Sequence, residues 1–201
     1  MMNTDRTFWQ IGAGDNDRNH ADICLRWGVI LNGPGEYGPW PECEEKLRKD
    51  GYSARKVSDI RKFCDSDASV RDGDVVVLRV GTSSVYGVGI VRGGYEWFDD
   101  FGDVDGWDIQ HVRRVQWVWK YSDSPQPFKT YALKRGDTTQ TLNEGEVKNW
   151  INEKISLDVR RKSLPKLPPS CIDGEWLDKI SREEIGEHLF DSGSVRARLA
   201  V

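Results

Sequence analysis

The chain has no long apolar run and no excess of positive charge. No apolar stretch approaches the ~18 residues that a membrane-spanning helix needs. The start, MMNTDRTFWQ, lacks the apolar segment of a secretory signal. We therefore expect a cytoplasmic protein. The net charge of −4 argues against sequence-blind adhesion to nucleic acid, because that mode depends on a broad basic surface.

Residues for metal, redox and catalytic chemistry are also scarce. The four cysteines form no CxxC pair and the three histidines show no ligand spacing, so neither a zinc site nor a disulfide framework is predicted, and no cofactor is expected. Asp137 with Glu146 and Lys148 superficially resembles a nuclease site in which carboxylates hold Mg²⁺. Because the glutamate falls in a helical pattern, we expect no enzymatic activity from this chain.

Tryptophan, by contrast, is abundant. The chain has nine tryptophans in 201 residues, more than a core of this size usually needs. Full burial of tryptophan is costly because the indole N–H requires a hydrogen-bond partner. Some of these rings are therefore expected at a surface or in a pocket.

Apolar periodicity predicts an α+β domain over residues 1–157, a basic proline-rich linker over 158–171 and a short helical tail or adaptor over 172–201. Gly87 and Gly89 interrupt one of the predicted strands and favour a bend, as in a small closed barrel. The predicted strands are 8–14, 28–35, 71–81, 85–91, 111–120 and 128–136, and the predicted helices are 15–27, 41–52, 53–67 and 143–155.

The order of these segments resembles the PUA-like superfamily, and within it the EVE and YTH branch of modified-base readers. The resemblance rests on FWQIGAG, on WGVILNG, on the hairpin DGDVVVLRVGTSSVYGVGIV and on HVRRVQWVW, and it covers roughly residues 8–155. It implies a small bent β-barrel flanked by helices. One departure is Ile30, which stands where the YTH pattern has a tryptophan of its base cage.

The resemblance also implies a function. Such a domain, without catalysis, holds one flipped or unpaired modified base, which stacks on indole rings while polar groups read its edge. We expect a methylated base in nucleic acid, DNA ahead of RNA, and a role as the targeting module of a restriction or defence system with a nuclease partner or fused domain. The alternatives are an RNA-binding PUA-like domain and a protein-interaction module that uses the aromatic, acidic loop at residues 95–110.

That loop supplies the first candidates for a base pocket. Trp107 follows Gly106, which frees the backbone, and precedes Asp108, whose carboxylate could accept a proton from a base amino group. Trp97 and Tyr95 share the loop. Each of these rings could instead plug the end of the barrel.

Further pocket candidates come from the first two predicted strands and the loops that follow them. Asn32, in NGPG, could read a base edge or form the turn that such a sequence favours. Asp15 and Asn16 could hydrogen-bond a base or cap the following helix. Trp27 could face the pocket or pack between helix and strand, and Trp40 could be a second stacking surface or a lid.

Contacts to the nucleic-acid backbone are predicted at the start of the last long strand. Arg113 and Arg114, next to His111, are suited to holding phosphates at the rim of the pocket. The alternative for the two arginines is an ion-pair network with the aspartates that precede them.

Overall fold

The computed structural model describes residues 6–15, 17–65, 69–143, 145–155 and 162–167. The predicted tail at 172–201, most of the predicted linker and Asn16 lie outside the described residues. The elements are β1 (Phe8–Gly12), α1 (Ala21–Trp27), β2 (Val29–Asn32), α2 (Glu42–Lys49), α3 (Ala54–Cys64), β3 (Val75–Val80), β4 (Ser84–Trp97), the short 3₁₀ helix η1 (Asp99–Phe101), β5 (His111–Lys120), β6 (Gln126–Pro127), β7 (Thr139–Thr141) and α4 (Glu146–Lys154).

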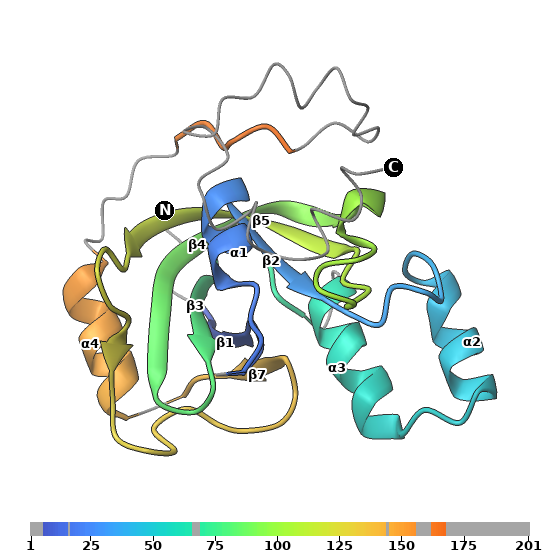
Figure 1. Ribbon diagram of the computed structural model, residues 1–201, viewed down its shortest axis with the longest axis horizontal. Helices are drawn as coiled ribbons and strands as arrows, with labels where there is room; N and C mark the ends of the chain where they lie inside the picture. Colours follow the sequence, from blue (N-terminus) through green and yellow to red (C-terminus); the bar gives the residue numbers. More distant parts are fainter. Residues whose placement is uncertain (1–5, 16, 66–68, 144, 156–161, 168–201) are drawn as a thin grey trace.

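The fold is α+β, as predicted, and is built on one mixed sheet of seven strands (Figure 1). The strand order is β2-β5-β4-β3-β1-β7, with β6 paired to β4. Only β1 and β3 run parallel. The two outer strands, β2 and β7, are not paired with each other, so the described sheet is open, and the closed barrel that the glycines suggested does not form.

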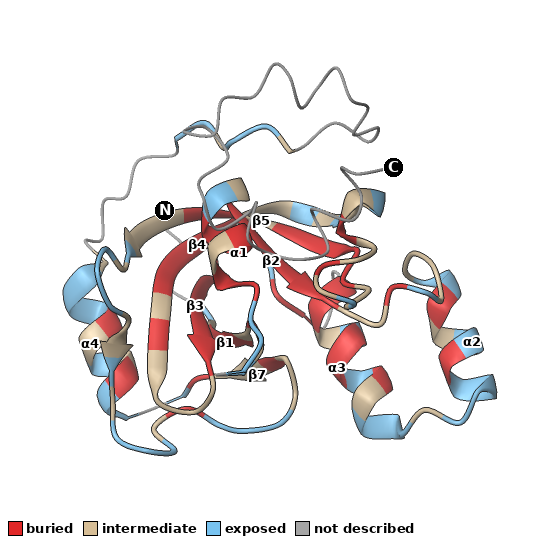
Figure 2. Cartoon of the chain, viewed as in Figure 1, coloured by how far each residue is buried: buried red, intermediate tan, exposed pale blue. Residues whose placement is uncertain are grey.

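Helices cover both faces of this sheet, which explains why β3 is buried throughout and apolar except for Arg79. Val76 and Leu78 of β3 belong to a core that also contains buried side chains of α1, α2 and α3. Val75 and Val77, which point to the opposite face, belong to a second core with Val147 of α4. Figure 2 shows the resulting buried centre and the exposed outer surfaces of α2 and α4.

The predicted hairpin of β3 and β4 is present, and its glycines have a steric cause. A β-bulge lies between Val88 and Gly89 where β4 pairs with β5. A Cβ atom on Gly89 would lie 2.3 Å from Val115 Cγ1 and 2.7 Å from the Trp117 ring. Glycine is needed there because β5 packs directly on the backbone of β4.

One strand prediction is wrong. The segment 128–136 forms turns, and the neighbouring pairings are made by the short strands β6 and β7 instead. Tyr131 has a positive φ of 67° and is 71% exposed. The apolar pattern there reflects the single buried side chain of Leu133, which anchors the crossing from β6 to β7.

The described part of the predicted linker, residues 162–167, lies against the sheet. Lys162 N donates to Gln116 Oε1 at 3.2 Å, and the Arg114 guanidinium donates to the carbonyl oxygen of Pro165. This part of the proline-rich segment therefore belongs to the domain surface.

Candidate pocket between the ends of the sheet

A pocket of about 700 Å³ opens where β1, β2 and β3 end. Four of the residues predicted for a base pocket line it: Asp15, Asn32, Trp107 and Asp108. Its volume lies within the range of ~300–1,000 Å³ that is usual for small-molecule sites. Residues from six separate parts of the chain meet here, within 12–20, 31–36, 52–56, 79–82, 106–109 and 135–138.

The aromatic, acidic loop presents Trp107 through a tight turn. Val104 and Trp107 exchange two backbone hydrogen bonds of 2.9 and 3.0 Å, and the two residues between them, Asp105 and Gly106, have φ values of 52° and 75°. This Asp-Gly pair in the left-handed region is typical of a type I′ turn, and the glycine takes the conformation that side chains rarely adopt. The local sequence thus fixes the position of the indole.

Three groups surround the Trp107 ring. The Arg18 guanidinium lies over it, 4.1 Å from the ring centroid, and is held by a 2.6 Å hydrogen bond to the carbonyl oxygen of Asp105. The His20 ring meets it edge-on, at 5.2 Å between centroids and an interplanar angle of 82°. A Cβ on Gly14 would lie 2.9 Å from the indole. Contacts of this kind orient the ring before any ligand arrives.

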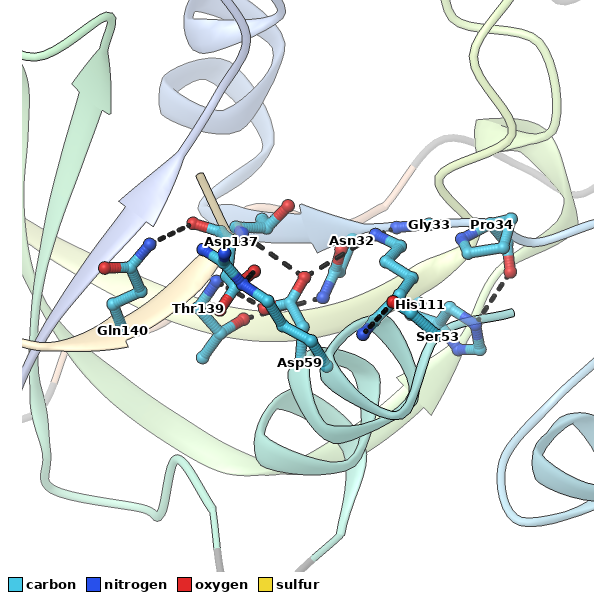
Figure 3. A network of polar contacts seen from close by, with 12 residues as sticks. Asn32, Gly33, Pro34, Ser53, Asp59, His111, Asp137, Thr139 and Gln140 are labelled. Atoms are coloured by element: carbon cyan, nitrogen blue, oxygen red, sulfur yellow. Dashed lines mark hydrogen bonds and ion pairs between the residues drawn. The ribbon is translucent and has the colours of Figure 1, made fainter. Parts of the chain in front are cut away.

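Asn32 and Asp15 line the pocket, but much of their hydrogen-bonding capacity is used internally. Asn32 Oδ1 accepts from Gly33 N at 2.9 Å. Asn32 Nδ2 donates to Thr139 Oγ1 at 3.5 Å, and this contact joins β2 to β7 through side chains (Figure 3). Asp15 Oδ1 accepts from the backbone N–H groups of Asp17 and Arg18. Asp15 therefore organises the loop before α1, and Asn32 stabilises the turn after β2.

Asp59 of α3 forms the base of the same network (Figure 3). It is fully buried and accepts from Thr138 N at 3.2 Å and Thr139 N at 2.7 Å. The Lys56 ammonium lies 3.5 Å from the carboxylate. Asp59 thus holds β7 against α3, opposite the end of β2, and keeps this side of the pocket in place.

Two buried polar side chains that line the pocket, His20 and Arg79, were not among the residues predicted for it. His20 is 6% exposed and Arg79 is 5% exposed. Burial, with a smaller contribution from Arg18, lowers the pKa of His20 to about 3, so the imidazole is neutral at pH 7. The only sequence signal for Arg79 was a charged residue inside an otherwise apolar strand, and the isolated His20 gave none.

The remaining aromatic candidates do not line this pocket. Tyr95 and Trp97 pack around His111, with the Tyr95 hydroxyl 3.0 Å from His111 Nδ1 and the Trp97 ring edge-on to the imidazole. Trp40 N donates to the same hydroxyl. Trp27, at the end of α1, packs against the first core. None of these four rings lines the pocket.

The residues predicted to hold phosphates have other partners. His111 is fully buried between Tyr95 and the carbonyl oxygen of Pro34, and burial lowers its pKa to about 4. Arg113 is 2% exposed and donates to the carbonyl oxygens of Phe63 and Cys64. Neither side chain has a surface to offer a phosphate. Neighbouring residues on a strand point to opposite faces, which separates Arg113 from Arg114.

Two of the residues that resemble a nuclease site have separate partners. Asp137 pairs with Arg55 at 2.7 Å, and Glu146 accepts from Lys129 N at 3.3 Å. In the described part of the chain, no three His, Cys, Asp or Glu side chains are grouped so that they could hold a metal ion. The acidic loop folds inward, with Phe101, Val104 and Ile109 buried.

None of the helices in the described ranges is long and apolar enough to cross a membrane.

Comparison with known proteins adds a family but no function. Searches of curated proteins and of solved structures returned no match. Residues 9–144 match the family described as Domain of unknown function (DUF8426), and this range contains every residue that lines the pocket. The match covers more than half of the chain, so the protein belongs to the DUF8426 family.

Proposed function

We propose that this domain binds a modified base of a nucleic acid, extruded from its strand, in the pocket beside Trp107. One observation carries the proposal. The pocket combines an oriented indole with convergent polar side chains, including Asn32, Asp108 and His20, in a volume suited to a nucleoside. A flat ring with polar edges is the ligand class that stacking plus edge recognition selects.

The proposal extends to the fold and the biological setting. The strand order and a pocket at the strand ends favour a distant relationship to PUA-like domains of the EVE and YTH type, with an open sheet instead of a closed barrel. We propose noncatalytic binding, DNA ahead of RNA, in the cytoplasm. We also propose that this domain is the targeting module of a restriction or defence system, with nuclease activity in a partner or fused domain.

The test is the affinity of the full chain for short single strands that differ by one methylated base, measured by fluorescence anisotropy of a labelled strand. Stacking contributes ~1–3 kcal/mol per base, so Trp107→Ala should weaken binding of the methylated strand by roughly 5- to 150-fold and abolish the preference for it. Trp107→Phe should retain part of the preference because a smaller ring still stacks.

Trp97→Ala is the matched control, because Trp97 comes from the same segment but lies outside the pocket. It should leave the preference unchanged. Equal losses on methylated and unmethylated strands with Trp107→Ala would contradict recognition of the modification in this pocket.

Phosphate contacts are expected from cations at the pocket instead of from Arg113 and Arg114. Lys56 and the exposed Arg135 both line it. Each phosphate contact releases counterions, so Arg135→Ala should weaken binding several-fold at low salt and reduce the slope of log K against log salt by about 0.7–0.9. Arg114→Ala, whose guanidinium contacts Pro165, should change neither quantity. A reduced slope with Arg114→Ala and none with Arg135→Ala would contradict this assignment.

A further inference from the structure

His20 is a buried side chain whose hydrogen-bonding groups are unused. No described residue forms a hydrogen bond with either of its ring nitrogens, although the side chain is 94% buried and lines the pocket. A neutral imidazole offers one N–H donor and one acceptor nitrogen. Leaving both unpaired costs stability, and native proteins rarely leave a buried polar group in this state without a reason.

The same pocket contains a buried cation without an ion pair among the described residues. Arg79 Nη1 donates to the carbonyl oxygen of Gly81 at 2.8 Å and Nη2 to that of Asp137 at 3.1 Å, but its Nε has no partner. Asp59 favours the charged form electrostatically without pairing with it. Guanidinium groups stay protonated in proteins, so the pocket contains a buried positive charge.

The acidic groups of the pocket lie nearer the solvent. Asp15 and Glu36 are exposed and Asp108 is partly exposed, whereas His20 and Arg79 are buried. A base edge that reaches the buried part of the pocket therefore meets the N–H groups of His20 and Arg79, whereas the carboxylates lie toward the mouth, beside the exposed cation of Arg135. The inner edge of the base should carry acceptors, and its outer edge should carry a donor.

We propose that the pocket selects a base with a ring carbonyl oxygen, and that His20 and Arg79 recognise that acceptor edge. The inference rests on the proposed function and names its substrate class. A 5-methylated cytosine fits, because its O2 and N3 are acceptors and its amino group is a donor at the other end of the same edge. N6-methyladenine has no carbonyl, so it can offer the buried donors only ring nitrogens, and on its Watson–Crick edge N1 lies directly beside the methylated amino group.

The inference is tested with the full chain and three single strands that carry cytosine, 5-methylcytosine or N6-methyladenine at one position, again by fluorescence anisotropy. The wild type should bind the 5-methylcytosine strand at least ~10-fold more tightly than the N6-methyladenine strand, in line with one or two hydrogen bonds. His20→Phe should remove most of this difference and should raise the melting temperature, because it replaces an unpaired polar ring with an apolar one.

His111→Phe is the matched control. His111 is also buried, but both its nitrogens have partners and its ring does not line the pocket, so this variant should lower the melting temperature and keep the base preference. Should His20→Phe not fold, the smaller His20→Leu carries the same test.

The outcomes separate the two proposals. A tighter complex with N6-methyladenine, or an unchanged preference in a folded His20 variant, would overturn the carbonyl inference and leave modified-base recognition standing. Equal affinity for all three strands would overturn both.

Discussion

Replacing Asp59 with alanine should lower the free energy of unfolding by about 2–5 kcal/mol, the largest effect we expect from a single substitution away from the hydrophobic cores. The carboxylate accepts from two backbone N–H groups, those of Thr138 and Thr139, in a site without solvent. Alanine would leave both donors without an acceptor. It would also release β7 from α3 and so disturb the pocket, which Thr138 lines. Urea unfolding followed by tryptophan fluorescence measures the loss.

Two further variants isolate the cause. Asp59→Asn keeps one acceptor oxygen of similar shape and should lose roughly half as much as alanine. Asp137→Ala removes a nearby carboxylate whose partner, Arg55, is exposed, and such pairs contribute only ~0–1 kcal/mol. If Asp59→Ala were no less stable than Asp137→Ala, the assigned role of the buried carboxylate would be wrong.

Replacing Arg113 with methionine should lower the free energy of unfolding by about 2–4 kcal/mol while the folded variant binds nucleic acid with unchanged affinity. Arg113 donates to the carbonyl oxygens of Phe63 and Cys64, the last two residues of α3. Helix ends leave such carbonyls without intrahelical partners and carry partial negative charge. The guanidinium therefore caps α3 from β5, and methionine preserves only the bulk of its stem.

The measurement pairs urea unfolding with anisotropy, so that stability and binding are separated. Arg113→Lys keeps the charge but loses the planar fork, and its stability should fall between those of the wild type and the methionine variant. Wild-type stability together with a loss of affinity would restore the phosphate role that the sequence suggested for this arginine.

Local features of the fold were predictable because their causes are local. The β3–β4 hairpin, the β5 strand and the helices α1 to α4 follow from apolar spacing and turn residues. The strand predicted at 128–136 was wrong because a few apolar residues imitate strand alternation although only Leu133 is buried. The prediction of a closed barrel was wrong for a different reason. Glycines indicate a bend, but whether β2 pairs with β7 depends on residues more than a hundred positions apart.

The residues of the candidate pocket also differ in whether local sequence could indicate them. Trp107 was predictable because the Asp105-Gly106 turn that presents it is encoded in four consecutive residues. His20 and Arg79 were not, since an isolated histidine and one arginine in an apolar strand carry no sign that they meet. Trp97 and Tyr95 were assigned to the pocket because they share its loop, but alternation along β4 turns both toward His111.

The sequence by itself therefore determined the α+β class, the order of the helices and strands from β1 to β5 and the tight turn before Trp107, all of which depend on periodicity and backbone conformation over a few residues. Only the tertiary structure decided which polar side chains share the pocket and which arginine caps a helix. Those outcomes depend on strand order and on the face from which each side chain emerges, and long-range pairing sets both.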